Sequence, residues 1–179
     1  MGRVQAGYPW CIGIDPGYGM TGMVLVDSFG DVVSEWAGAR APGEHEASRA
    51  ALHAGVIGVQ MANMVCMMPL CTLRVGIETP VYSGNALTFS KQWRLIQAIE
   101  QMLLGFPKVH IELAEIVNST SKKVLTGNGG ADKDAMVAAS PYAGRTDLAT
   151  SVREALADAY AHALAGQQTR DYNNFWRDF

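Results

Sequence analysis

The sequence predicts a single α/β domain with a five-stranded mixed β-sheet flanked by helices on both faces. Apolar residues make up 49% and charged residues 17% of the 179 residues, a balance typical of one globular core. Two strand-like segments joined by a short turn come early in the chain, and strand-like and helix-like segments alternate after them. A hairpin that leads into such alternation favours a mixed sheet with helices on both of its faces.

The N-terminal part predicts three strands. Residues 11–14 form a short apolar run, which is typical of a buried strand. Residues 21–26 and 31–36 predict a second and a third strand, and the turn between them pairs the two as a hairpin. Asp27 and Asp31 flank that turn, and we expect them to serve the turn rather than a functional site.

The rest of the chain predicts alternating helices and strands. Residues 46–68 and 86–104 show helical patterns, and Pro69 ends the first of these helices. Strands are expected at residues 73–77 and 109–117. After them we expect a polar, basic, glycine-rich loop at 118–130, a helix starting near 131–132, a last helix from 151 to about 166, and a tail without assigned structure at 167–179. The prediction is therefore one domain over residues 1–179, with its core at about 10–166.

The composition limits the function classes. A net charge of −3 provides no general attraction to nucleic acid, so DNA binding would depend on local basic patches. The three cysteines are Cys11, Cys66 and Cys71, and no histidine lies at zinc spacing beside the last two. An odd number of cysteines without zinc spacing favours reduced thiols in a cytoplasmic protein. The N-terminus also lacks the pattern of a signal peptide.

The uncharged, methionine-rich segment 50–70 is the candidate for a membrane span. On a helix, His53, Gln60 and Asn63 fall within about 80° of one another, which gives an otherwise apolar helix one polar stripe. We therefore expect a core or dimer-face helix rather than a span, and no membrane partner. The methionines suit an adaptable packing surface.

Two carboxylates end two of the predicted strands in the same way. Asp15 follows the apolar part of Ile-Gly-Ile-Asp-Pro-Gly, and Glu78 follows the apolar part of Val-Gly-Ile-Glu-Thr-Pro. If these strands are neighbours, both carboxylates lie at one edge of the sheet and shift each other's pKa by repulsion. A hard cation with oxygen ligands would relieve that repulsion, so the pattern predicts a metal site.

The last predicted helix adds Glu154 and Asp158, which lie at positions i and i+4 on one face. With the two strand-end carboxylates they predict a two-metal site, which holds the attacking and leaving oxygens of a phosphoryl displacement. Glu154 keeps a second interpretation, because Ser151 to Glu154 fits a capping box. His162 extends the stripe by one turn, and we expect it to be packed or exposed rather than catalytic.

Several segments resemble motifs of the RuvC-type Holliday junction resolvases. Residues 14–17 (Ile-Asp-Pro-Gly) with 21–22 (Thr-Gly) are similar to the family's opening motif, and 77–78 (Ile-Glu) to its second acidic motif. Residues 122–133 are similar to its basic loop, the most specific of these signals, and 157–159 (Ala-Asp-Ala) to its final acidic helix. The segments run from residue 12 to about residue 164 in the family's order.

The resemblance implies an RNase H-like fold, a homodimer, and paired symmetric nicks in four-way (Holliday) DNA junctions. It implies two divalent metal ions per active site, usually Mg²⁺, with Mn²⁺ able to substitute. Asp15 would bridge the two ions, and Glu78, Asp158 and Glu154 would complete their ligands. One ion would then activate the attacking water and the other would stabilise the leaving 3′ oxygen.

The resemblance also indicates residues that contact DNA. Lys122, Lys123 and Lys133 would bind phosphates, with a solvated basic loop as the alternative. Tyr82, an aromatic residue just after the second acid, would stack on a base at the junction centre, with a core or surface tyrosine as the alternative.

The sequence departs from the family at Ala155, where the third acidic or histidine ligand usually stands three residues before the last aspartate. Glu154 lies four residues before Asp158 on the same helix face, and its longer side chain could compensate. The departure therefore concerns the ligand set and not the expected fold.

Three other function classes are alternatives. The first is an RNase H-like nuclease that cuts flaps, forks or RNA–DNA hybrids, since the metal site would be the same. The second is an actin-like sugar or acetate kinase, which would need a second phosphate loop and an adenosine site that the sequence does not show. The third is a non-catalytic junction-binding dimer, which the departure at Ala155 supports.

Overall fold

A computed structural model of the protein describes residues 9–17, 19–39, 46–68, 72–80, 84–104 and 110–169. The described strands are β1 (Cys11–Asp15), β2 (Met20–Val26), β3 (Val32–Ala39), β4 (Leu73–Glu78) and β5 (Ile111–Ile116). They form one sheet in the order β3-β2-β1-β4-β5. β1, β2 and β3 pair antiparallel, whereas β1, β4 and β5 pair parallel. The predicted five-stranded mixed sheet is confirmed.

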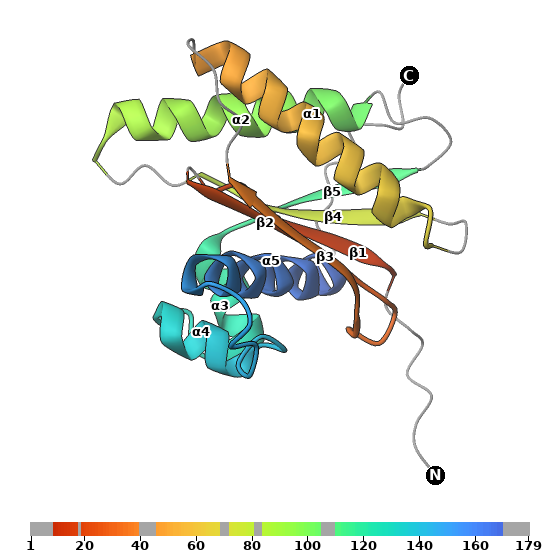
Figure 1. Ribbon diagram of the computed structural model, residues 1–179, viewed down its shortest axis with the longest axis vertical. Helices are drawn as coiled ribbons and strands as arrows, with labels where there is room; N and C mark the ends of the chain where they lie inside the picture. Colours follow the sequence, from red (N-terminus) through yellow and green to blue (C-terminus); the bar gives the residue numbers. More distant parts are fainter. Residues whose placement is uncertain are drawn as a thin grey trace.

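Helices cover both faces of this sheet, as the sequence predicts. The described helices are α1 (Glu46–Val65), α2 (Ala86–Leu104), α3 (Asn118–Thr126), α4 (Lys133–Ala139) and α5 (Thr150–Gln168). Figure 1 shows α1 and α2 above the sheet and α3, α4 and α5 below it. Two hydrophobic clusters correspond to these layers. One joins the sheet to α1 and α2 through side chains such as Ile57 and Ile99, and the other joins it to α5 through Leu156 and its neighbours.

α5 lies unusually close to the sheet, because glycines face it. A Cβ atom added to Gly13 of β1 would collide with the carbonyl oxygen of Ala159 on α5. One added to Gly76 of β4 would collide with the carbonyl oxygen of His162. These two glycines bring the helix backbone directly against β1 and β4, so side chains of α5 reach the ends of both strands.

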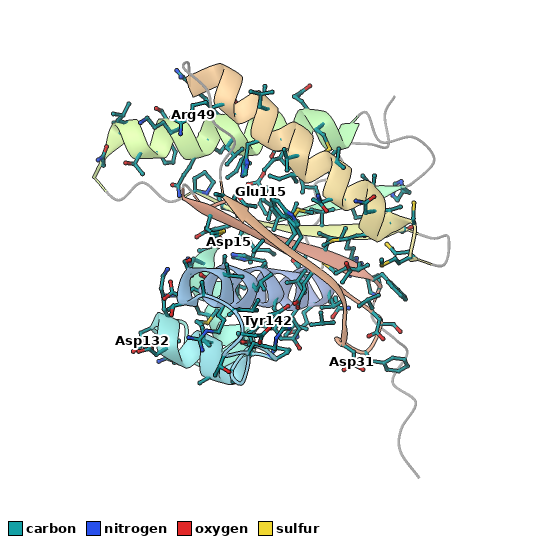
Figure 2. The ribbon with its side chains drawn as sticks, viewed as in Figure 1. Asp15, Asp31, Arg49, Glu115, Asp132 and Tyr142 are labelled. Carbon is teal, nitrogen blue, oxygen red and sulfur yellow. The ribbon has the colours of Figure 1, made fainter. Side chains whose placement is uncertain are left out.

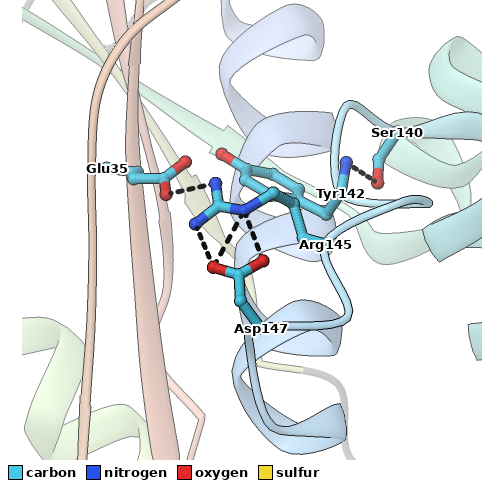
Figure 3. A network of polar contacts seen from close by, with 5 residues as sticks. All are labelled: Glu35, Ser140, Tyr142, Arg145 and Asp147. Atoms are coloured by element: carbon cyan, nitrogen blue, oxygen red, sulfur yellow. Dashed lines mark hydrogen bonds and ion pairs between the residues drawn. The ribbon is translucent and has the colours of Figure 1, made fainter.

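The segment between α4 and α5 is tied to β3 by charged side chains (Figure 3). Arg145 donates from Nη1 to Oε1 of Glu35 at 3.1 Å, and its Nε lies 3.0 Å from Oδ1 of Asp147. Tyr142, which is 1% exposed, packs between these groups and the α5 cluster. This contact connects the edge strand of the sheet to the segment that precedes α5.

The local predictions for the hairpin and for the second helix are confirmed. The carboxylate of Asp27 accepts hydrogen bonds from the backbone N–H groups of Phe29 at 2.8 Å and Asp31 at 3.0 Å, so Asp27 serves the turn. α2 has the predicted bounds, while α1 ends at Val65 and a turn follows it. Pro69 and Cys71 lie outside the described residues.

The prediction of a loop at 118–130 is wrong for its first part, which is the helix α3. The asparagine, serine and threonine residues at its start are typical of loops, but Val124 and Leu125 pack onto apolar clusters that include α5 residues. Gly127 ends the helix with φ 78°, and its N–H donates to the carbonyl of Lys123. Tertiary burial of one helix face outweighs the weak local propensity.

The last helix is also longer than predicted. α5 ends at Gln168, so Gln167 belongs to the helix and not to the tail. Its side-chain amide donates to the carbonyl oxygens of Pro9 at 3.0 Å and Asp27 at 2.6 Å. These bonds fix the end of α5 against the strands, and no local pattern announces them.

The polar residues predicted to form one stripe on α1 lie in different environments in the folded protein. His53 is fully buried and its Nε2 lies 2.7 Å from Oγ1 of Thr21, whereas Asn63 is exposed. The exposed side chains of α1 include apolar ones instead, among them Leu52 and Val59. None of the helices in the described part of the chain is long and apolar enough to cross a membrane.

Candidate metal centre

The parallel pairing of β1 and β4 brings the first two carboxylates together. Ile14 pairs with Ile77, so Asp15 and Glu78 stand next to each other where the two strands end. Figure 2 shows Asp15 at the end of the sheet, on the side of α5. The prediction that both carboxylates share one edge is confirmed.

Glu78 is also held from the next strand. Its partner in β5 is Ile116, and two residues later Asn118 donates from Nδ2 to Oε1 of Glu78 at 2.7 Å. Asn118 thus orients one oxygen of Glu78 at the start of α3. This contact depends on the pairing of β5 with β4, so no signal in the sequence could have found it.

α5 adds Asp158 to the group. Burial raises the pKa of Asp158 to about 6, and the charges of Glu78 and Glu154 act in the same direction, against those of Lys133 and Lys122. Since these charges act on Asp158, the carboxylates of β4 and α5 belong to one electrostatic group, as the sequence predicts.

Asp15 lies at the centre of this group. Burial raises the pKa of Asp15 well above its ordinary value, and the charges of Glu78 and Asp158 raise it further. The protein's own cations do not cancel these effects, although Lys133 acts against them. Such excess negative charge is typical of a site that binds a cation.

His162 is packed, as the sequence predicts, but it also lies beside the carboxylates. Asp15, Glu78 and His162 each offer one ligand atom, and these three atoms lie within 4.8 Å of one another. His162 is 1% exposed, and burial lowers the pKa of its imidazole to about 4. Its position one turn after Asp158 was a visible signal, but only the close packing of α5 shows that the side chain points to the strand ends.

Glu154 is paired and not a helix cap. Its Oε2 accepts from Nζ of Lys133 at 2.7 Å. α5 begins after Ala149, and within the described residues this position has no side-chain capping hydrogen bond. The capping-box interpretation is therefore wrong, and Glu154 is bound to α4 by an ion pair one turn before Asp158.

The basic residues of the predicted DNA-binding segment differ in their surroundings. Lys122 donates from Nζ to the carbonyl oxygen of Ala131 at 2.7 Å, whereas Lys123 is exposed. Lys133 keeps 66% of its side chain exposed while it pairs with Glu154. The charges of Lys122 and Lys133 both act on Asp158, so these residues lie near the carboxylates. Tyr82 lies outside the described residues.

The donor set fits a divalent cation. Asp15, Glu78 and Asp158 supply carboxylate oxygens, the ligands that Mg²⁺ and Mn²⁺ prefer. Burial and the neighbouring carboxylates raise the pKa values of Asp15 and Asp158, and a bound cation would offset both effects. The group can therefore bind a metal ion and, through it, a phosphate oxygen.

Comparison with known proteins supports the fold. No protein-family model and no curated protein matches the sequence. A structure of Thermus thermophilus RuvC superposes with a TM-score of 0.62 at 17% identity, over 87% of this chain and 92% of that one. T. thermophilus RuvC in complex with a Holliday junction substrate superposes with a TM-score of 0.61 at 19% identity, over 87% and 91%. The chain has the RNase H-like fold of RuvC.

Proposed function

We propose that this protein is a metal-dependent endonuclease that resolves four-way DNA junctions by paired symmetric nicks. The observation that carries the proposal is the juxtaposition of Asp15 and Glu78 at one edge of the sheet, next to the charge of Asp158 on α5. The fold is that of RuvC, for which a complex with a Holliday junction substrate is known.

The carboxylates would hold two Mg²⁺ ions, or Mn²⁺ in their place. Bound there, the ions would supply Lewis-acid activation of water and stabilisation of the leaving 3′ oxygen. The charges of Glu78 and Asp158 both act on Asp15, which makes Asp15 the candidate for a ligand shared by both ions. Asn118 would keep Glu78 oriented through its hydrogen bond. Glu154 would complete the ligand set when it separates from Lys133.

DNA would approach over α3 and α4. Lys122 and Lys133 put positive charge beside the carboxylates, where a phosphodiester must lie to be cut. Lys123 is exposed on α3 and would contact a neighbouring phosphate. Tyr82 follows Glu78 by four residues and stays the candidate for stacking on a base at the junction centre.

A homodimer would supply the two active sites that paired nicks require. α1 lies on the opposite face of the sheet from α5 and exposes Leu52, Val56 and Val59 to 56%, 40% and 61%. These residues follow the spacing i, i+4, i+7 and share one stripe of the helix. The sequence carries no charge from residue 50 to residue 73, which favours burial of this stripe against a second copy.

Cleavage of a synthetic four-way junction tests the proposal. In Mg²⁺ the protein should nick two opposed strands at symmetric positions, and Asp15→Asn should reduce the rate about a thousandfold or more, because ion-dependent stabilisation of several kcal/mol is lost. Junction binding by Asp15→Asn should persist or tighten. Asp31→Asn, at the hairpin turn, is the matched control and should cut normally.

The same assay distinguishes the alternatives when forks, flaps and RNA–DNA hybrids are run beside the junction. If a fork, flap or hybrid is cut faster than the junction, the function is the broader nuclease activity and not junction resolution. Junction binding without nicking in either metal would indicate a non-catalytic binder. Full cleavage by Asp15→Asn would exclude the assigned site.

A further inference from the structure

His162 enters the carboxylate cluster from within the protein core. It lies one turn after Asp158 on α5, and the residue is 1% exposed. One of its ring nitrogens lies within 4.8 Å of carboxylate oxygens of both Asp15 and Glu78. Its Nδ1 is buried without a hydrogen-bond partner among the described residues.

A second buried histidine among the described residues shows how this chain satisfies an imidazole that serves only the core. His53 is 0% exposed, and its Nε2 lies 2.7 Å from Oγ1 of Thr21. A buried polar atom without a partner is unfavourable, so a structural histidine normally has one, as His53 does. His162 is as deeply buried, yet its Nδ1 has no partner in the part of the chain that the structure describes, and its imidazole lies beside carboxylates instead.

The backbone places His162 there by a specific packing arrangement. A Cβ atom at Gly76 would collide with the carbonyl oxygen of His162, so the glycine allows this turn of α5 to lie directly on β4. Two residues after Gly76, the same strand ends at Glu78. The histidine and the carboxylate therefore approach the same point from the helix and from the strand.

We propose that His162 is a metal ligand that binds, through a ring nitrogen, the cation held by Asp15 and Glu78. The inference rests on the metal centre of the proposed function. Glu154 is paired with Lys133, and Ala155 beside it has no donor atom, so the start of α5 offers no ready ligand besides Asp158. His162 supplies one from the following turn. A nitrogen ligand also favours Mn²⁺ and Co²⁺ over Mg²⁺, which prefers oxygen ligands.

Spectroscopy of the Mn²⁺-loaded protein tests this directly. Electron spin echo modulation should show ¹⁴N coupling from a directly bound imidazole in the wild type, and His162→Gln should abolish it. Calorimetric titration should show that His162→Gln weakens Co²⁺ and Mn²⁺ binding on the order of tenfold, with a smaller loss for Mg²⁺. His110→Gln is the matched control, because His110 is exposed, and it should change neither result.

Two spectroscopic outcomes would overturn the inference: no ¹⁴N coupling in the wild type, or coupling that persists in His162→Gln. If His162→Gln does not fold, His162→Asn replaces the ring with a smaller side chain, and the same two readouts apply. If Asp15→Asn loses metal binding and the His162 variants keep it, the proposed metal centre is supported and only the role of His162 is excluded. Unchanged binding in Asp15→Asn as well would exclude the centre itself.

Discussion

Asp158 illustrates how one side chain exchanges stability for a binding site. Its ordinary pKa is 3.8, and burial raises it to about 6 in the folded protein. Between these values the folded state holds a proton that the unfolded state has lost, so stability falls as the pH rises. Above pH 6 the folded state carries the full cost of the ionised, buried Asp158, which is about 3 kcal/mol for a pKa raised from 3.8 to about 6. Asp15 acts in the same direction.

In the metal-free protein, Asp158 and Asp15 should lower the free energy of unfolding as the pH rises from 5 to 8, whereas His162, whose pKa burial lowers to about 4, raises it up to about pH 6.5. Asp158→Asn should raise the free energy of unfolding at pH 8 and remove the part of the fall that Asp158 causes, because the neutral side chain carries no charge to desolvate. Mg²⁺ should stabilise the wild type at pH 8, since it binds the folded state alone. Thermal unfolding in EDTA and in Mg²⁺ at both pH values measures this.

Asp31→Asn is the control for this series, because Asp31 lies at the exposed hairpin turn. It should keep the pH dependence of the wild type. Equal pH dependence in Asp158→Asn and the wild type would contradict the assignment of Asp158 to the charged cluster.

At the scale of elements, α3 and α4 form one wall of the site, and the sequence predicts a loop where α3 lies. Lys122 and Lys123 are neighbours on α3 but have different roles. Lys122 donates to the carbonyl oxygen of Ala131 and so joins α3 to the start of α4, while Lys123 is exposed. A helix presents its lysines in fixed directions, so the two residues can be tested separately.

Lys123→Ala should weaken junction binding and reduce the slope of log affinity against log salt by about 0.9, with unchanged thermal stability, because it removes one phosphate contact. Lys122→Ala should in addition destabilise the protein by about 1–3 kcal/mol, through loss of its bond to the carbonyl of Ala131. Salt-dependent binding and thermal unfolding of both variants measure this. Lys91→Ala on α2, across the sheet, should leave the salt slope unchanged. An unchanged slope in Lys123→Ala would remove that residue from the interface.

At the scale of the whole molecule, the sheet separates two surfaces. The helices α3, α4 and α5, which carry the lysines and Asp158, lie on one side of the sheet, and α1 with its exposed apolar stripe lies on the other. A dimer formed through α1 would leave both metal centres accessible to DNA. This separation lets association and cleavage be changed independently.

Val59→Lys should convert the proposed dimer to a monomer, because it places a charge in its interface. The variant should keep its fold and metal affinity but nick the two strands of a junction independently rather than in pairs. Light scattering after size exclusion, and supercoiled cruciform cleavage, measure these effects. Val33→Lys on β3, at an exposed valine outside α1, is the matched control and should stay dimeric. A Val59→Lys variant that remains dimeric would exclude this face.

By itself the sequence determined the sheet, its flanking helices and three of the grouped residues. Short apolar runs ending in Asp15 and Glu78 predict buried strands with carboxylates at one edge, and Asp158 follows from helical spacing. These features depend on period and composition, which are local. Only the tertiary structure decided that 118–126 is helical, that Glu154 pairs with Lys133, and that His162 reaches the cluster. Each of these results depends on the contact of α5 with the sheet or with its neighbouring helices, and such contacts join residues that no local pattern relates.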